Sequence, residues 1–207
     1  MLKMRNLHRM VTLAALAAAA ASCGDVVRDG RSPVFLVIDR LAGSRGAATP
    51  GQPTNPLLSD VITIVTSPAP CSSSTPCPTV FNDIGQVVMH LTSKNVSLAP
   101  TTNNQVTISR YHVTYRRADG RNTQGVDVPF AFDGTVTGLV PPDGQVTLSF
   151  ELVRHVAKEE SPLVQLIVNP GIISTIADVT FYGTDQVGNA ISAAGSMTIE
   201  FGNFGDQ

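Results

Sequence analysis

The sequence has little charge and a shortage of basic residues, which narrows its expected partners. Asp, Glu, Lys and Arg make up only 14% of the 207 residues, and 14 Lys and Arg stand against 16 Asp and Glu. Domains that bind nucleic acid usually carry a basic excess, so nucleic acid is excluded as an expected partner. The basic residues are also too few for a polybasic membrane-binding face.

Motifs of common catalytic and metal sites are missing as well. The chain contains no Gly-x-Ser-x-Gly elbow, no glycine-rich phosphate loop and no Asp-x-Asp-x-Asp calcium string. A metal site needs three or four converging ligands, whereas His90, His112 and His155 stand far apart in the sequence. We therefore expect no enzymatic activity, no cofactor and no metal ion.

The one long apolar run, at the N-terminus, is too short to span a bilayer. Lys3, Arg5 and Arg9 precede the uncharged stretch Met10–Ala21, and a transmembrane helix needs about 20 apolar residues. A positive start, a short apolar run and small residues are typical of a secretory signal. We predict a signal over residues 1–22, which leaves 11 Lys and Arg against 16 Asp and Glu because the three basic residues named are removed.

The end of this signal, Ala20-Ala21-Ser22-Cys23, resembles the lipobox of bacterial lipoproteins. The resemblance implies that Cys23 receives a diacylglyceryl group and then a further acyl chain such as palmitate, so that the lipid bilayer becomes a partner. Ala20 departs from the Leu, Val or Ile usual in that family. Gly24 in place of Asp implies the outer membrane rather than the inner one. The alternative is an ordinary secretory signal cut after Ala21, with Cys23 as a free thiol.

The three cysteines fit an exported, lipidated chain. An odd cysteine in an exported protein needs an explanation, and lipidation of Cys23 leaves Cys71 and Cys77 to pair. These two close a ring of seven residues and should form a disulfide in an oxidising compartment. Their spacing is not Cys-x-x-Cys and no histidine is nearby, which disfavours a redox or zinc pair.

Alternating apolar residues and many Gly and Pro turns predict an all-β fold. Ser67–Pro78 contains four prolines, which argue against regular pairing there. A change of parity in the longest strand predicts a β-bulge near Ser109. Gln145–Pro170 stays open between a strand and a helical insertion, with a helical turn or an edge strand over Arg154–Val168. Strands are expected in Ser32–Leu41, Asp60–Thr66, Gln86–Ser93, Val106–Arg117, Val126–Phe132, Thr135–Leu139 and Gln145–Val153, with turns at Asp133-Gly134 and Pro141–Gly144, and a hairpin over Ala177–Phe201.

Several short motifs resemble a fibronectin type III domain. Tyr111–Tyr115 is similar to strand C of that family, Thr135–Pro141 to strand E, and Phe181–Asn189 to the F–G hairpin. The resemblance implies an Ig-like antiparallel β-sandwich of about eight or nine strands, with a role in adhesion or scaffolding. The chain departs from the family in having no tryptophan and in Gln145–Pro170, which has the place of an insertion.

Together these patterns predict three segments and one general function. Residues 1–22 form the signal, 23–59 the lipidated cysteine, a tether and a possible first strand, and 60–207 the β-sandwich. We expect an envelope lipoprotein with a non-catalytic binding or structural role, whose partner is an envelope protein or a polysaccharide. The alternative is a periplasmic or surface lipoprotein that binds carbohydrate or another small ligand.

A group of basic residues offers a tentative site for an anionic partner. Its members lie on one predicted strand and in the turn that follows: Arg110, His112, Arg116, Arg117 and Arg121. The alternative is an ordinary solvated face.

Overall fold

The computed structural model describes residues 31–47, 49–97 and 101–205, which form an all-β fold. Besides the strands, this part of the chain has a short helix α3 (His155–Glu159) and two 3-10 turns, η1 (Thr102–Asn104) and η2 (Leu163–Ile167). The ten strands are β1 (Val34–Ser44), β2 (Leu57–Asp60), β3 (Thr63–Val65), β4 (Cys77–Thr79), β5 (Asp83–Ser93), β6 (Val106–Arg116), β7 (Phe132–Val140), β8 (Gln145–Val153), β9 (Ile173–Asp185) and β10 (Ala190–Gly202).

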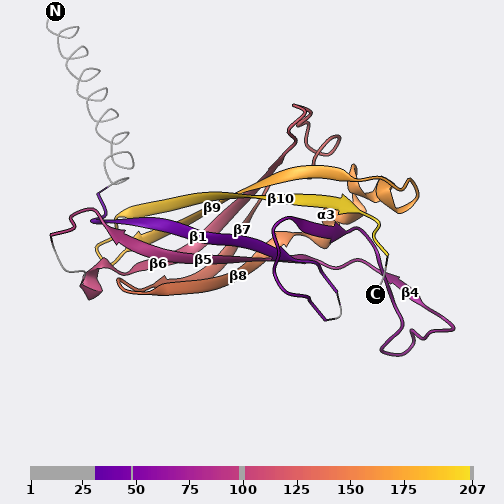
Figure 1. Cartoon of the computed structure of the whole chain (residues 1–207), viewed down its shortest axis with the longest axis horizontal. Helices are drawn as coiled ribbons and strands as arrows, with labels where there is room; N and C mark the ends of the chain where they lie inside the picture. The colour runs from indigo at the N-terminus through magenta and orange to yellow at the C-terminus, as the bar shows by residue number, and fades with distance from the viewer. Residues whose placement is uncertain (1–30, 48, 98–100, 206–207) are drawn as a thin grey trace, which may run out of the picture.

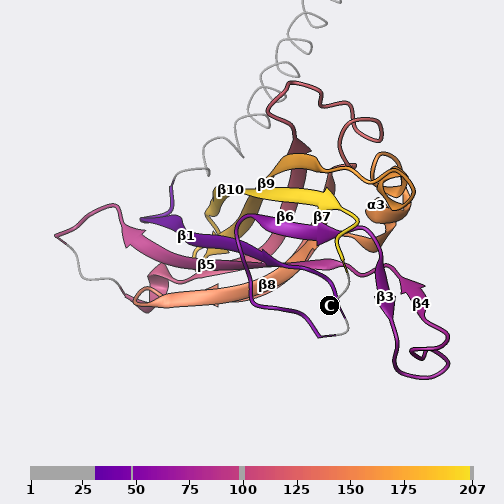
Figure 2. The same ribbon diagram turned by 45° about the vertical axis from the view of Figure 1, so that its right-hand side comes forward.

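Two main sheets enclose the core in an arrangement compatible with a β-sandwich (Figure 1). Sheet A has the strand order β1-β5-β8, and sheet B has the order β2-β10-β9-β6-β7. All pairs in these sheets are antiparallel except β2, which runs parallel to β10. A separate two-stranded sheet of β3 and β4 stands away from both main sheets (Figures 1 and 2).

The alternation of apolar and polar residues correctly predicts which side chains of both sheets are buried in the core. Val87 and Met89 of β5 are fully buried, as are Val179 and Phe181 of β9. Side chains alternate between the two faces of a strand, so their polar neighbours point outward. The bulge predicted near Ser109 is confirmed, because the pairing of β6 with both β7 and β9 shifts register between Ile108 and Arg110.

The expected strand over Val126–Phe132 is wrong except at its end. Val126 and Phe130 are 65% and 55% exposed, and the backbone coils here because the Thr123 carbonyl accepts hydrogen bonds from the amides of residues 126–128. The turn expected at Asp133-Gly134 is also wrong, since β7 runs straight through both residues. Gly134 leaves room for a side chain from β6, as shown below.

The segment Asp60–Thr66 forms two short strands rather than one. β2 ends at Asp60 and β3 begins at Thr63, and β3 pairs with β4. The expectation that prolines prevent pairing in Ser67–Pro78 is wrong at its end, because Pro78 lies within β4 opposite Ile64. Proline is tolerated here because the pair has free edges on both sides.

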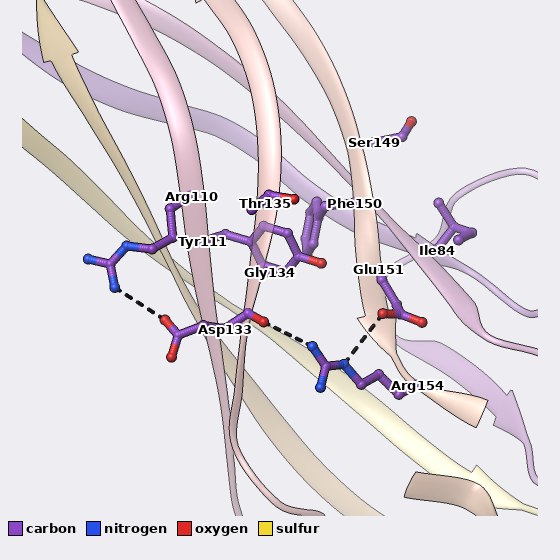
Figure 3. A pocket seen from close by; sticks show the side chains of 10 residues that line it. All are labelled: Ile84, Arg110, Tyr111, Asp133, Gly134, Thr135, Ser149, Phe150, Glu151 and Arg154. Atoms are coloured by element: carbon purple, nitrogen blue, oxygen red, sulfur yellow. Dashed lines mark hydrogen bonds and ion pairs between the residues drawn. The ribbon is translucent and has the colours of Figure 1, made fainter. Parts of the chain in front are cut away.

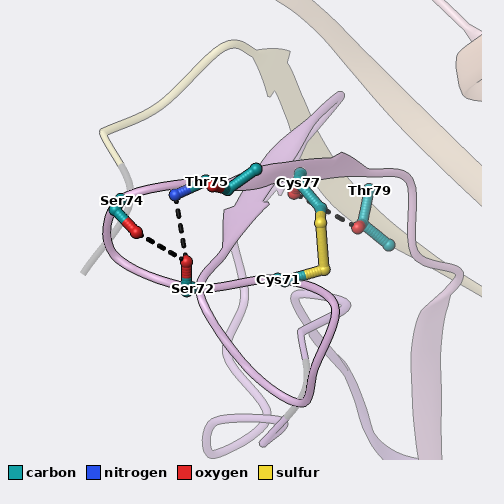
Figure 4. The surroundings of a disulfide bond; sticks show 6 residues. All are labelled: Cys71, Ser72, Ser74, Thr75, Cys77 and Thr79. Atoms are coloured by element: carbon teal, nitrogen blue, oxygen red, sulfur yellow. Dashed lines mark hydrogen bonds between the residues drawn. A yellow bond between two sulfur atoms is a disulfide. The ribbon is translucent and has the colours of Figure 1, made fainter.

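The predicted disulfide between Cys71 and Cys77 is confirmed and closes the loop between β3 and β4 (Figure 4). The two Cα atoms are 5.5 Å apart, within the usual range for a disulfide. Inside the ring, the Ser72 hydroxyl accepts a hydrogen bond from the Thr75 amide at 3.0 Å. The loop is therefore held both covalently and by its own polar groups.

The open question over Gln145–Pro170 resolves into a strand followed by two helical turns. Gln145–Val153 is β8, which pairs with β5 and completes sheet A, so treating this part as an insertion is wrong. The remainder contains α3 and η2, and Leu163 and Leu166 of η2 pack into the core. Of the two alternatives left open over Arg154–Val168, the structure shows helical turns and not an edge strand.

The N-terminal predictions concern residues that the structure does not describe. The signal over residues 1–22 and the lipidation of Cys23 both lie outside the described residues. Within the described ranges, no helix is both long enough and apolar enough to cross a membrane.

Candidate functional site

A groove of about 660 Å³ lies where the edge of sheet B meets the edge of sheet A, between β7 and β8 (Figure 3). Its walls come from four strands, β5, β6, β7 and β8, and from Arg154, which follows β8. The lining residues are Ile84, Arg110, Tyr111, Asp133, Gly134, Thr135, Ser149, Phe150, Glu151 and Arg154.

Two glycines of β7 determine the shape of this seam. At Gly138 the sheets meet closely, since a Cβ atom there would lie 2.3 Å from Leu148 Cδ2 of β8. At Gly134 the Tyr111 ring fills the space instead, with its Cζ 2.2 Å from where a Cβ would be. The Tyr111 and Phe150 rings then contact edge to face with centroids 5.0 Å apart. The groove therefore has an aromatic floor at the Gly134 end.

The rim of the groove carries charges of alternating sign. Arg110 Nη1 lies 3.3 Å from Asp133 Oδ1, and Arg154 Nε lies 3.4 Å from Glu151 Oε2. Arg154 also donates a hydrogen bond of 2.9 Å to the Asp133 carbonyl and stacks 4.0 Å above the Phe132 ring. Figure 3 shows Asp133 between the two arginines. These exposed pairs are worth about 0–1 kcal/mol each, so a ligand can replace their contacts at little cost.

The Tyr111 hydroxyl adds a neutral hydrogen-bonding group to the floor. Burial raises the pKa of Tyr111 above its ordinary value of 10.0, and a hydrogen bond with the Glu151 backbone offsets part of that shift. The phenol therefore stays protonated at neutral pH. With Thr135 and Ser149 nearby, the groove offers hydroxyl, carboxylate and guanidinium groups over an aromatic floor.

Each member of the predicted basic group has an acidic partner. Arg110 and His112 both contact Asp133, the latter at 3.2 Å. Arg116 Nε donates to Asp178 at 2.6 Å. The face of β6 is therefore of mixed charge, and only Arg110 of this group lines the groove.

The other two members of the basic group share one carboxylate in the turn after β6. Arg117 and Arg121 each place a guanidinium nitrogen 2.8 Å from Asp119 Oδ2. Hydrogen bonds from Arg117, and next from Arg121, hold the pKa of the Asp119 carboxyl well below its ordinary value of 3.8. Asp119 thus stays ionised, contacts both cations and offsets one of their two positive charges.

His90 belongs to a polar chain that the sequence pattern did not predict. Its Nδ1 lies 2.8 Å from Asp39 Oδ1, and its Nε2 lies 3.1 Å from Thr92 Oγ1. The order of groups matches an Asp-His-hydroxyl triad. Asp39 Oδ2 also accepts a hydrogen bond of 3.1 Å from the Gln145 side chain of β8. The trio is a surface hydrogen-bond network.

A fully buried ion pair is the second feature that sequence reasoning missed. Lys158 Nζ of α3 lies 2.8 Å from Asp83 Oδ1 of β5, and both side chains have no solvent exposure. The two residues are 75 positions apart in the sequence. The sequence around each of them looks like that around a charged surface residue, so it does not predict their burial. Among the described residues, no group of three or more His, Cys, Asp or Glu side chains is placed to hold a metal ion.

Comparison with known proteins adds no relative from which a role could be transferred. A scan against protein-family models finds no match to the chain, and a search of curated proteins finds none either.

Proposed function

We propose that this chain is an exported, lipid-anchored envelope protein whose β-sandwich binds a carbohydrate in the groove between β7 and β8, without catalysis. The observation that supports this most is the convergence of Arg110, Tyr111, Asp133 and Arg154 on one hollow. Binding pockets combine an apolar surface with a few placed polar groups. A purely structural role would need no such hollow.

The charge balance of the groove selects a class of ligand. Two arginines and two carboxylates line it, so it carries no net positive charge to attract a polyanion. Sugars offer both hydroxyl donors and acceptors and weakly polar faces. The alternating rim and the aromatic floor suit a neutral oligosaccharide better than an acidic one.

We assign the sandwich to the immunoglobulin-like class from its strand order. Sheet A then corresponds to strands A, B and E, and β7-β6-β9-β10 corresponds to strands C′, C, F and G. In this assignment Thr135–Val140 takes the C′ place and β8 the E place, which revises the motif comparison made from the sequence. Fold alone does not assign function, so the proposal depends on the groove.

The proposed location depends on the signal-like N-terminus and the disulfide. Disulfides persist in oxidising compartments outside the cytosol, which agrees with export of a chain containing Cys71–Cys77. Acylation of Cys23 would attach the domain to a membrane, with the outer membrane favoured. Labelling cells with a fatty acid tests this directly. The wild-type protein should carry the label and a Cys23→Ser variant should not. An unlabelled wild-type protein would show that the chain has no lipid anchor.

Binding is tested with matched substitutions on β7. Thr135 and Thr137 are both exposed on the same face of this strand, but only Thr135 lines the groove. We expect Thr135→Trp to fill the groove and weaken binding of a neutral oligosaccharide, measured by calorimetry, at least about tenfold, or ~1.4 kcal/mol. Thr137→Trp should leave the affinity unchanged.

Three outcomes would contradict the proposal. If no envelope polysaccharide fragment binds, carbohydrate is not the ligand. If Thr135→Trp and Thr137→Trp weaken binding equally, the groove is not the binding site. Recovery of a cleaved oligosaccharide after incubation would show catalysis.

A further inference from the structure

The buried pair of Asp83 and Lys158 stands where four segments of the chain converge. The Asp83 carboxylate opens β5, and Lys158 comes from α3. The Gly46 amide donates to Asp83 Oδ1 at 2.8 Å, and the Ser59 hydroxyl of β2 donates to Oδ2 at 2.5 Å. We propose that the side chains of Lys158 and Asp83 condense to an amide bond after folding, so that this pair is a site of covalent self-modification.

Local contacts hold both reacting groups in place. The Asn82 side chain accepts a hydrogen bond of 2.7 Å from the His155 amide, which fixes the start of α3 beside β5. Gly46 lies so close to this segment that a Cβ atom there would be 2.3 Å from the Asn82 carbonyl oxygen. Such positioning converts a bimolecular reaction into an effectively unimolecular one, with a large rate gain.

The Asp83 carboxylate and the Lys158 ammonium differ in how many of their possible hydrogen bonds they form. The Asp83 carboxylate accepts hydrogen bonds from three donors, whereas among the described residues the Lys158 ammonium donates only to Asp83. An ammonium has three protons to donate, and an ion in a dry interior is costly unless it is fully paired. Transfer of one proton from Lys158 to Asp83 makes both groups neutral and yields an amine facing a carboxylic acid.

The condensation balances without any further reactant. The Lys158 Nζ lone pair attacks Asp83 Cγ, and the Gly46 amide stabilises the negative charge that develops on Oδ1. Oδ2 then leaves as water, taking the carboxyl proton and one proton from Nζ, with the Ser59 hydroxyl as relay. One C–N bond forms, one C–O bond breaks and one water molecule is released. Exclusion of bulk water from the site protects the product from hydrolysis.

The resulting bond would close the chain from β5 to α3 into a covalent loop. That loop contains β5, β6, β7 and β8, which include both walls of the groove. An exported protein would thereby gain a cross-link that reducing agents cannot break, unlike the disulfide.

Mass spectrometry of the purified full chain tests the cross-link. We expect the wild-type mass to be lower by one water molecule than its composition requires, and this deficit to vanish in Lys158→Met. Lys94→Met is the matched control, because the Lys94 ammonium lies over the exposed Phe35 ring, 4.9 Å from its centroid, and not beside Asp83. This variant should keep the mass deficit. Trypsin should fail to cut after Lys158 and should release a branched peptide joining the two segments.

Two further measurements keep the result decisive. Cyclic imides at the Asp-Gly pairs 29–30, 119–120, 133–134 and 143–144 would also lose water, but they would survive in Lys158→Met and give no branched peptide. Ser59→Ala keeps both reacting groups, and in a pulse-chase experiment it should form the cross-link at least about tenfold more slowly. A wild-type chain of full mass that trypsin cuts after Lys158 would overturn the proposal.

Discussion

The β9–β10 hairpin and the β3–β4 hairpin reach stability in different ways. The β9–β10 hairpin buries Val179, Phe181 and Ile199 completely in the core between the sheets. The β3–β4 hairpin has no fully buried side chain, and Ile64 at its centre is 40% exposed. A disulfide closes the second hairpin, whereas the first has none. A covalent bond here replaces the apolar burial that a two-stranded sheet cannot supply.

The strongest test of this contrast removes one ring from the long hairpin. Phe181 is fully buried and contacts both Tyr111 and Phe150, with centroids 6.2 and 5.1 Å away. We expect Phe181→Ala to lower the free energy of unfolding by about 3–5 kcal/mol, because it leaves a cavity. The matched change in the short hairpin, Ile64→Ala, should cost no more than about 0.5 kcal/mol. Urea denaturation measures both, and similar losses would abolish the distinction.

The next test opens the disulfide. Cys71 and Cys77 close a ring of seven residues, and the chain-entropy model assigns about 2 kcal/mol to so short a loop. We expect the double variant Cys71→Ser, Cys77→Ser to expose the β3–β4 hairpin to proteolysis while the main sheets stay folded. Limited proteolysis followed by mass spectrometry locates the cut. Cleavage within β9–β10 as well would mean that the disulfide supports the whole fold.

The two hairpins also show what the sequence could predict. In β9 the apolar residues Ala177, Val179 and Phe181 alternate with polar ones, and this period of two defines the buried face. The Ser109 bulge was predictable for the same reason, since the parity changes there. The pattern failed at Val126–Phe132, where alternating apolar residues lie in a loop. Local hydrogen bonds to the Thr123 carbonyl determine the backbone there, and periodicity does not report them.

The candidate site was less predictable because it depends on contacts between distant segments. Arg110 was identified from its charge, but nothing in the sequence placed Asp133 and Arg154 beside it. Their meeting requires the edges of two sheets to face each other at the β7–β8 seam. Lys158 was missed for the same reason, since its burial follows from the position of α3 against β5. Turn and strand signals are local, whereas these sites are tertiary.

The smallest expected effect concerns acid, to which the two hairpins should respond differently. Residues 63–79 contain no ionisable side chain apart from the bonded cysteines, whereas Asp178 of β9 pairs with Arg116 and accepts a hydrogen bond from Ser196. Partial burial alone would raise the pKa of Asp178, but these two partners outweigh it and lower the pKa below 3.8.

A lowered pKa in the folded state means that this pair stabilises the protein above about pH 4 and that the contribution disappears as the pH falls through the folded-state value. Because the pair is partly exposed, we expect Asp178→Asn to cost less than about 1 kcal/mol at pH 7. The difference between wild type and variant should shrink toward zero in denaturation curves taken at successively lower pH. Proteolysis of the β3–β4 hairpin at the same pH values, with an acid-active protease, should not change between the two proteins. If the difference in unfolding free energy between wild type and Asp178→Asn persists below the folded-state pKa, Asp178 acts through packing rather than charge. The long hairpin would then be stabilised by packing alone, without a contribution from this ion pair.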